Sequence, residues 1–303
     1  MSAAVFAFCD GDEQARALAG GLGIAAHGIE RRAFPDGESL VRVPPVPAVV
    51  DTALLFRSLN DPNDKIVEIL FAAAALRASG ARRVMLVAPY LGYMRQDMAF
   101  HPGEAISQRV IGKLIAGHFD GLVTIDPHLH RIAALDQVVP AIPAVAVSAA
   151  PALAAALARD MEPGTLLIGP DRESAPWVER IAARLGLDMI VAEKCRRGDR
   201  DVVLRLPEAA RVDGRVAVII DDIVSSGSTL IACAALLRTS GARRVEAAAT
   251  HCLAGPADLE RLYAAGVARL RTSDSVPGPV ATIPLATVLG DAIRELGWLE
   301  SMR

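Results

Sequence analysis

Residues 216–230 read Val216-Ala-Val-Ile-Ile-Asp-Asp-Ile-Val-Ser-Ser-Gly-Ser-Thr-Leu230, an apolar run followed by two carboxylates and a turn of small residues. The run Val216–Ile220 is typical of a strand buried in a parallel sheet, and the turn is a favourable helix start. Such a turn offers backbone N–H groups and the positive end of a helix, so Ser225–Thr229 predicts a phosphate site. Asp221 and Asp222 can accept sugar hydroxyls or bind a metal. Together these features indicate a sugar phosphate as the ligand.

The composition describes a globular chain and excludes some partners. Its 303 residues suffice for two domains, and 52% hydrophobic residues with 22% charged ones is unlike a disordered protein. A net charge of -3 argues against nucleic acid as a partner. The four cysteines show no CxxC spacing, which favours a reducing cytoplasm. Pro143 and Pro151 interrupt the longest apolar stretch, so we expect no membrane partner.

A short repeat divides the chain. Leu76-Arg-Ala-Ser-Gly-Ala-Arg-Arg-Val84 recurs as Leu237-Arg-Thr-Ser-Gly-Ala-Arg-Arg-Val245, so the two copies are offset by the difference between positions 76 and 237. All positions but one are identical, which favours duplication of one α/β domain over coincidence. Prolines punctuate a short linker at 142–148, so we expect domains at 1–145 and 146–303.

Apolar runs and helical patterns alternate along both halves, as in doubly wound parallel sheets. The expected strands include 53–56, 84–88, 122–125, 166–168, 189–191 and 216–220, and the expected helices include 65–79 and 176–185. The predicted fold class is α/β, with two duplicated doubly wound parallel-sheet domains. Shifting the phosphate loop back by the offset of the repeat places Asp222 on Asp61 and the loop on Asp64–Glu68. That acidic, glycine-free segment cannot cradle a phosphate, so only the C-terminal domain is expected to bind one.

The segment Asp221–Thr229 resembles the phosphoribosyl-diphosphate (PRPP) signature shared by ribose-phosphate diphosphokinases and type I phosphoribosyltransferases. Four more parts of the chain are similar to ribose-phosphate diphosphokinases, so the resemblance covers nearly the whole chain. They are Phe34-Pro-Asp-Gly-Glu38, Pro89–Asp97 with Phe100–Ser107, Thr124–His130 with Gly169–Glu173, and Ala192–Arg200. The sequence Phe100-His-Pro-Gly-Glu104 resembles the archaeal-type branch. The resemblance implies that both domains have the type I phosphoribosyltransferase fold.

The same resemblance implies a role for each segment. It implies an ATP site made of Phe34, Asp36, Glu38, Arg95, Gln96 and Asp97. It implies a ribose 5-phosphate site made of Asp221, Asp222, Ser225, Ser226, Gly227, Ser228 and Thr229. It implies Mg2+ held by His128 and Asp171, and a catalytic pair, Lys194 and Arg196, at the start of a flexible loop. The implied reaction moves the β,γ-diphosphoryl group of ATP onto ribose 5-phosphate and yields PRPP and AMP.

One residue departs from the family pattern, and two other functions share the signature. Ser228 stands where the family loop usually has glycine, so it is strained if the position needs a positive φ and adds a donor if it does not. A phosphoribosyltransferase would have no use for the Arg95-Gln96 or Lys194-x-Arg196 elements. A non-catalytic regulatory paralogue would be expected to lose its cationic and metal-binding residues. The resemblance also implies a homo-oligomer in which Phe34 reaches a neighbour's ATP site.

Overall fold

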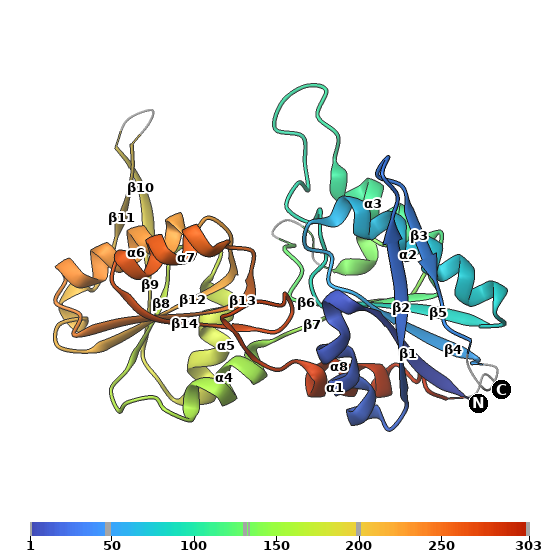
Figure 1. Ribbon diagram of the computed structural model, residues 1–303. Coiled ribbons are helices and arrows are strands. Elements are labelled where there is room, and N and C mark those ends of the chain that lie inside the picture. The colour runs from blue at the N-terminus through green and yellow to red at the C-terminus, as the bar shows by residue number, and fades with distance from the viewer. Residues whose placement is uncertain (1, 46–49, 130–131, 133, 198–200, 301–303) are drawn as a thin grey trace. The chain divides into compact units, whose positions relative to one another are not determined.

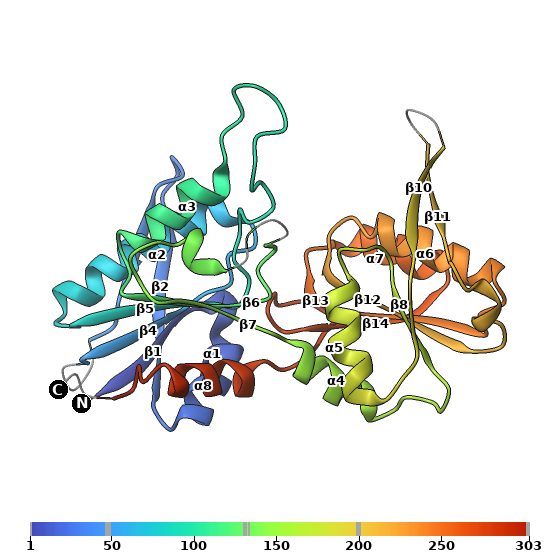
Figure 2. The same ribbon diagram turned by 180° about the vertical axis from the view of Figure 1, so that it is seen from behind.

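The computed structural model describes residues 2–45, 50–129, 132, 134–197 and 201–300 (Figure 1). The chain forms two compact units, residues 1–148 with 285–303, and residues 149–284. Each unit is a sheet with helices on both faces (Figures 1 and 2). Within the described residues, no helix combines the length and the apolar character that crossing a membrane requires.

The first unit contains a seven-stranded sheet in the order β3-β2-β1-β4-β5-β6-β7. Its elements are β1 (Ala3–Phe8), η1 (Cys9–Gly11), α1 (Asp12–Leu22), β2 (Ala25–Ala33), β3 (Ser39–Arg42), β4 (Thr52–Phe56), α2 (Pro62–Ala78), β5 (Arg83–Ala88), α3 (Ser107–Ala116), β6 (Gly121–Ile125), η2 (Leu135–Gln137), β7 (Ala144–Val147) and α8 (Ala286–Glu295). Neighbouring strands run parallel, except in the antiparallel hairpin β2–β3. The inner strands β4 and β6 are buried along their whole length, because helices cover both faces of the sheet.

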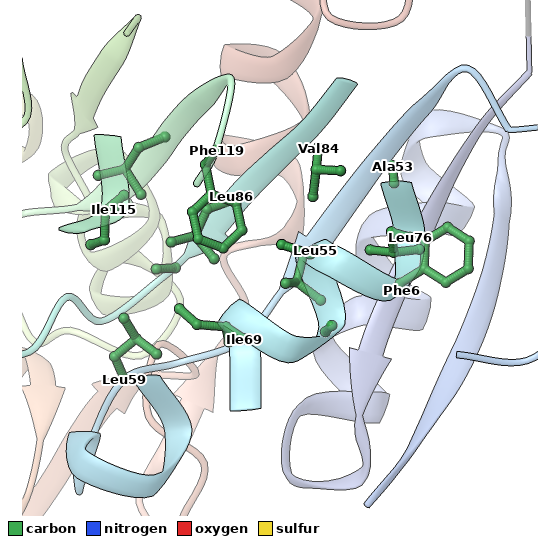
Figure 3. Close-up of a cluster of buried hydrophobic side chains, with 14 of the residues drawn as sticks. Phe6, Ala53, Leu55, Leu59, Ile69, Leu76, Val84, Leu86, Ile115 and Phe119 are labelled. Carbon is green, nitrogen blue, oxygen red and sulfur yellow. The ribbon is translucent and has the colours of Figure 1, made fainter. Parts of the chain in front are cut away.

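The main hydrophobic core of this unit lies between the sheet and helices α2 and α3 (Figure 3). Ile69 and Leu76 of α2 are two helical turns apart, so they share one face of the helix. They belong to the same buried cluster as Leu55 of β4 and Leu86 of β5 (Figure 3). Helices α1 and α8 cover the opposite face of the sheet (Figures 1 and 2). This packing fixes where the strands end, and therefore where the loops that carry candidate site residues begin.

The second unit contains a six-stranded parallel sheet in the order β15-β14-β13-β12-β8-β9 and a separate antiparallel ribbon, β10–β11. Its elements are α4 (Ala150–Ala158), β8 (Leu166–Gly169), α5 (Ala175–Leu185), β9 (Met189–Val191), β10 (Glu193–Arg197), β11 (Asp201–Arg205), η3 (Ala209–Arg211), β12 (Val216–Val224), α6 (Ser228–Thr239), β13 (Arg244–Cys252), α7 (Pro256–Ala264), β14 (Val267–Ser273) and β15 (Ala281–Ile283). Helices α6 and α7 cover one face of the sheet, and α4 and α5 cover the other (Figures 1 and 2).

The two sheets have the same topology. Strands β2-β1-β4-β5-β6-β7 are arranged as β9-β8-β12-β13-β14-β15, with the same parallel neighbours. The predicted fold class, two duplicated doubly wound parallel-sheet domains, is therefore confirmed. The first segment of the first unit ends at Ser148, inside the predicted boundary region 142–148, but β7 lies in that region and pairs with β6, so it is a strand and not a linker.

The C-terminal helix corrects the predicted domain boundaries. Helix α8 packs against α1, and α4 packs against α5. Helix α8 of the first unit follows β15, the last strand of the second unit, and α4 of the second unit follows β7, the last strand of the first. Leu289 and Ile293 of α8 are buried, and Trp298 lies against Gly121, where an added Cβ would come within 2.8 Å of the indole. Residues 285–303, predicted to belong to the second domain, thus complete the first unit, because its outer helix comes from the end of the chain.

Strand register also corrects the equivalence of the two loops. Arg83 and Arg244 are as far apart in the sequence as the two copies of the repeat. Their strand partners, Thr52 and Val216, are separated by more residues. The offset changes because α2 has 17 residues and α6 has 12. The constant offset predicted that Asp222 matches Asp61, and the strand register shows that it does not.

Candidate functional site

The signature segment lies at the carboxyl end of β12, near the middle of the second sheet. The strand extends to Val224, so the prediction that it ends before the two carboxylates is wrong. Asp221 still pairs with Ala249 of β13, and Ile223 pairs with His251. The strand continues because Val224 is buried and resumes the apolar pattern after the acids.

Gly227 makes the turn from β12 into α6. Its φ is +73°, in the left-handed region that glycine adopts without strain. Ser228 is the first residue of α6 and lacks a positive φ, so it is not strained. Its hydroxyl lies 3.2 Å from that of Ser226, and Arg261 of α7 donates to the Ser226 carbonyl at 3.3 Å. The turn thus combines hydroxyl groups with the start of a helix.

Acidic side chains from two neighbouring strands gather near this turn. Asp171 follows β8, which pairs with β12. Burial, and then the charges of Asp222 and Asp171, raise the pKa of Asp221 well above its usual value. Burial and the charges of Asp221 and Asp171 raise the pKa of the Cys233 thiol in α6 to about 12. This concentration of negative charge suits a cation or hydroxyl donors.

The turn that starts α5 fixes the position of Asp171. Its Oδ1 atom accepts hydrogen bonds from the N–H groups of Glu173, at 3.0 Å, and Ser174, at 3.2 Å. The Ser174 hydroxyl donates to the Asp171 carbonyl at 2.6 Å. Gly169 makes room for this turn, because a Cβ there would lie 2.8 Å from the Ser174 hydroxyl. The carboxylate is therefore held in place by its own backbone.

Lys194 and Arg196 lie on the ribbon β10–β11, which continues from β9 (Figure 1). Their backbone pairs with Leu204 and Val202, so the expected open loop begins as a two-stranded ribbon. The two positions alternate with Cys195 along one strand and therefore share a face of the ribbon. The side chains at 194–203 lie outside the part of the chain that the structure describes.

In the first unit, the turn Phe34–Glu38 joins β2 to β3, and it contains Asp-Gly, a sequence that favours tight hairpin turns. The Phe34 N–H donates to the Glu38 carbonyl at 2.7 Å, and the Glu38 N–H donates to Asp36 Oδ1 at 3.2 Å. The Arg32 guanidinium lies 5.4 Å from the centroid of the Phe34 ring. All of these side chains are exposed, so the turn presents an aromatic ring and two carboxylates to solvent.

The segment after β5 is anchored by a residue that the sequence analysis missed. Gln108 of α3 is fully buried, and its Nε2 donates to the Met94 carbonyl at 3.1 Å. Its backbone N–H donates to the Gln96 carbonyl at 3.4 Å. Arg95 is exposed between these two bonds, and the next candidate, Asp97, is buried. Gln108 carries no motif signal, because it acts only through contacts with the preceding loop.

Glu104 closes the loop between β5 and α3. Its Oε2 atom accepts the N–H of Phe100 at 2.7 Å and lies 3.5 Å from Nε2 of Gln96. The Phe-His-Pro-Gly-Glu sequence that ends at Glu104 is the local signal for this residue. Glu104 orients the amide of a residue predicted to bind ATP.

His128 follows β6, the strand next to β5. It is half-buried, and the preceding Asp126 has a φ of +31° and donates its N–H to the Val147 carbonyl at 2.9 Å. Such backbone strain in a non-glycine residue is frequent at functional sites. Because β5 and β6 are parallel neighbours, His128 and the segment Arg95–Asp97 leave the sheet at the same edge.

Each unit therefore brings together its own subset of the predicted site residues. In the second unit the signature turn and Asp171 lie at the carboxyl edge of one sheet. Doubly wound folds bind their ligands at this edge. In the first unit the Phe34 turn, the Arg95 segment and His128 follow the carboxyl ends of parallel strands. Within the described residues, no three His, Cys, Asp or Glu side chains converge as a metal site.

Comparison with known protein families identifies both halves of the chain. Residues 3–117 match the N-terminal domain of ribose phosphate pyrophosphokinase, and residues 145–271 match the phosphoribosyl transferase domain. A ribose-phosphate pyrophosphokinase from Methanopyrus kandleri is 33% identical over 294 residues, which is 96% of this chain and 99% of the relative. The Halobacterium salinarum protein of the same name is 33% identical over 281 residues, 92% of this chain and 96% of the relative.

A solved structure has the same fold over the full chain. The crystal structure of phosphoribosylpyrophosphate synthetase from Mycobacterium smegmatis superimposes with a TM-score of 0.82 at 23% identity. The match covers 98% of this chain and 99% of that one. The C-terminal helix that completes the first unit is thus part of a shared architecture.

Proposed function

The chain belongs to the ribose-phosphate pyrophosphokinase family, and we propose that its residues divide the synthesis of PRPP from ATP and ribose 5-phosphate between the two units. As a member of this family it is an enzyme that transfers a diphosphoryl group from ATP and releases AMP. The observation that carries the assignment of sites is the acidic pair in β12 followed by the left-handed Gly227 and the start of α6.

The second unit binds ribose 5-phosphate in this proposal. The N–H groups and hydroxyls of Ser225–Thr229 hold the 5-phosphate at the positive end of α6. Asp221 and Asp222 accept hydrogen bonds that the ribose hydroxyls donate. Burial and the charges of Asp222 and Asp171 raise the pKa of Asp221, and hydrogen bonds donated by the bound hydroxyls would stabilise its charged form.

The first unit supplies the ATP site. Phe34 stacks on the adenine, Glu38 accepts from its amino group, and Asp36 orders the turn. Arg95 binds phosphate oxygens, Gln96 binds the nucleoside, and Asp97 supports that loop. The burial of Asp97 and the bonds from Gln108 support this division, because they leave Arg95 projecting from a fixed backbone.

A divalent cation fits the acidic residues of the second unit. Carboxylate oxygens suit Mg2+, and the acidic side chains of the second unit repel one another without a cation nearby. Mg2+ keeps several waters and needs one or two protein ligands, to which we assign His128 and Asp171. When bound, it would neutralise charge on the diphosphate. The backbone bonds to Asp171 Oδ1 orient that carboxylate in advance.

The transfer itself needs positioning and neutralisation of charge more than a nucleophilic side chain. The anomeric hydroxyl of the sugar attacks the β-phosphorus, a new O–P bond forms, and the bond between the β-phosphorus and the AMP oxygen breaks. The hydroxyl proton is released to solvent. Lys194 and Arg196 stabilise the charge that develops on the leaving oxygen. Their shared strand and shared face of the ribbon support a joint role.

We also propose that the enzyme works in the cytoplasm as a homo-oligomer. The free thiols Cys9, Cys233 and Cys252 suit a reducing compartment. Symmetric assembly is the usual state of such enzymes, and the exposed Phe34 turn is available to a neighbouring copy.

One assay tests the proposed function against its alternatives. Purified protein is mixed with Mg2+, ATP and ribose 5-phosphate, and we expect equal amounts of AMP and PRPP. Release of diphosphate only from PRPP with a nucleobase would mean a phosphoribosyltransferase. Inactivity in both assays would mean a regulatory paralogue. Neither alternative is favoured, because named pyrophosphokinases match almost the whole chain, including the first unit.

A further inference from the structure

The first unit contains a buried charge network in which no site residue discussed above takes part. Arg57, directly after β4, is 2% exposed, and Glu68 of α2 is 0% exposed. Arg57 Nη1 donates to Glu68 Oε2 at 2.6 Å, and its guanidinium lies 3.9 Å from the centroid of the Phe8 ring. Each charge needs the other, because a buried charge without its partner is strongly destabilising.

The second oxygen of Glu68 connects this network to the β2–β3 hairpin. Glu68 Oε1 accepts hydrogen bonds from Arg31 Nε at 2.5 Å and from Ser39 Oγ at 2.8 Å. Arg31 lies on β2 and Ser39 is the first residue of β3. One buried carboxylate therefore holds both strands, on either side of the turn Phe34–Glu38.

The other end of the network is attached to the ends of two more strands. Asp10, which follows β1, lies 3.4 Å from Arg57 Nε and 3.1 Å from Lys65 Nζ. Lys65 Nζ also donates to the Ser58 carbonyl at 3.0 Å and to Asn60 Oδ1 at 2.9 Å. The ends of β1 and β4 and the start of α2 thus form one frame on which the hairpin is held.

We propose that Glu68 and Arg57 are positioning residues for ATP, because they fix the orientation of the hairpin whose turn carries Phe34 and Glu38. The inference rests on the proposed function, which assigns that turn to the ATP site. Glu68 acts through Arg31 and Ser39, and Arg57 acts through Glu68. Loosening the hairpin weakens the use of ATP and leaves the ribose 5-phosphate site, in the other unit, unchanged.

The first test loosens the hairpin without disturbing the buried ion pair. Ser39→Ala and Arg31→Met each remove one bond to Glu68 and keep the Arg57–Glu68 pair. Each is expected to raise the KM for ATP about fivefold, and the double variant further, with the KM for ribose 5-phosphate unchanged. The matched control is Glu30→Gln, which removes an exposed ion pair to Arg42 between the same two strands. It is expected to change neither KM.

The outcomes separate this inference from the proposed function. An unchanged KM for ATP in the Ser39→Ala/Arg31→Met variant, with a raised one in Phe34→Ala, would overturn the positioning role alone. No effect in Phe34→Ala either would overturn the nucleotide site itself. Equal rises in both KM values would show general loss of structure and also overturn the inference. Glu68→Gln should raise the KM for ATP about tenfold or more; if it does not fold, the hairpin variants decide.

Discussion

Arg57 of the first unit occupies the position that Asp221 occupies in the second, because β4 and β12 are equivalent strands whose partners β5 and β13 fix their register. Arg57 directly follows β4, and Asp221 lies in β12 three residues before the strand ends. In the second unit this place holds a carboxylate close to a helix-starting turn. In the first unit it holds a cation paired with Glu68. The duplicated fold thus carries opposite charges at one position, which agrees with different ligands for the two units.

Replacing Gly227 tests the signature turn. Alanine at a φ of +73° is strained by about 1–2 kcal/mol, although a Cβ there meets only Leu262, at 3.9 Å. We expect Gly227→Ala to raise the KM for ribose 5-phosphate about tenfold, because relief of the strain opens the turn. Gly278→Ala is the control in the same unit, since a Cβ there meets nothing within 4 Å. Equal kinetic effects of the two variants would contradict the role of the turn.

The buried carboxylate of Glu68 makes stability depend on pH. Burial alone would raise its pKa, but hydrogen bonds from Ser39 and Arg57 and the charge of Arg57 outweigh burial and lower the pKa below its usual value. A lowered folded pKa stabilises the protein above the unfolded pKa, and this stability is lost as the pH falls through the folded value. We expect Glu68→Gln to reduce the free energy of unfolding by about 3–5 kcal/mol at neutral pH.

The measurement is denaturant unfolding of wild type and Glu68→Gln across the acid range. The difference in unfolding free energy should begin to shrink as the pH falls below the ordinary pKa of glutamate, roughly 4.3, where the unfolded chain takes up the proton, and should keep shrinking until the pH passes the lowered folded pKa. Glu30→Gln, at an exposed ion pair, should differ from wild type by less than about 1 kcal/mol throughout. A Glu68→Gln difference that stays constant down to the acid limit would disprove this electrostatic account.

The placement of the C-terminal helix α8 in the first unit can be tested by creating one cavity in its buried face. Ile293 of α8 is fully buried, so Ile293→Ala should cost about 2–5 kcal/mol. Because α8 packs on α1, we expect hydrogen exchange to accelerate in α1 more than in α6 of the second unit. Glu295→Ala, at an exposed position of the same helix, is the control. Acceleration confined to the second unit would refute the corrected boundary.

The ribbon residues should affect turnover more than binding. We expect Lys194→Ala and Arg196→Ala each to lower kcat by about 100- to 1,000-fold, because they act on charge that develops in the transition state. Arg197 is the next residue along β10, on the opposite face of the ribbon, so Arg197→Ala is the matched control. A loss of similar size in Arg197→Ala would point to the ribbon's net charge instead of the assigned pair.

The sequence was sufficient where the signal is local. The apolar strands and the glycine turn at Gly227 follow from neighbouring residues, so these features were predicted near their observed positions. The end of β12 was misjudged because Asp221 and Asp222 interrupt the apolar pattern that Val224 resumes. Here the local signal failed where a largely buried strand carries two acidic residues.

Contacts distant in the sequence could not be predicted. The amphipathic pattern of α8 shows that one face is buried, but not that its partner is α1 at the other end of the chain. No local pattern marks Arg57, because its partners Glu68 and Asp10 lie on other elements of the chain. The constant offset between the two domains failed for a similar reason. Helix α2 is longer than α6, and this difference in length leaves the repeated motif at the end of each helix unchanged.

The location of bound ribose 5-phosphate is the most direct test of the two-unit account. In a crystal structure of the enzyme with this ligand, we expect one molecule per chain, with its phosphate at the N–H groups of Ser225–Thr229 and its hydroxyls at Asp221 and Asp222. A ligand bound instead beside Arg57 in the first unit, or in both units alike, would contradict the account.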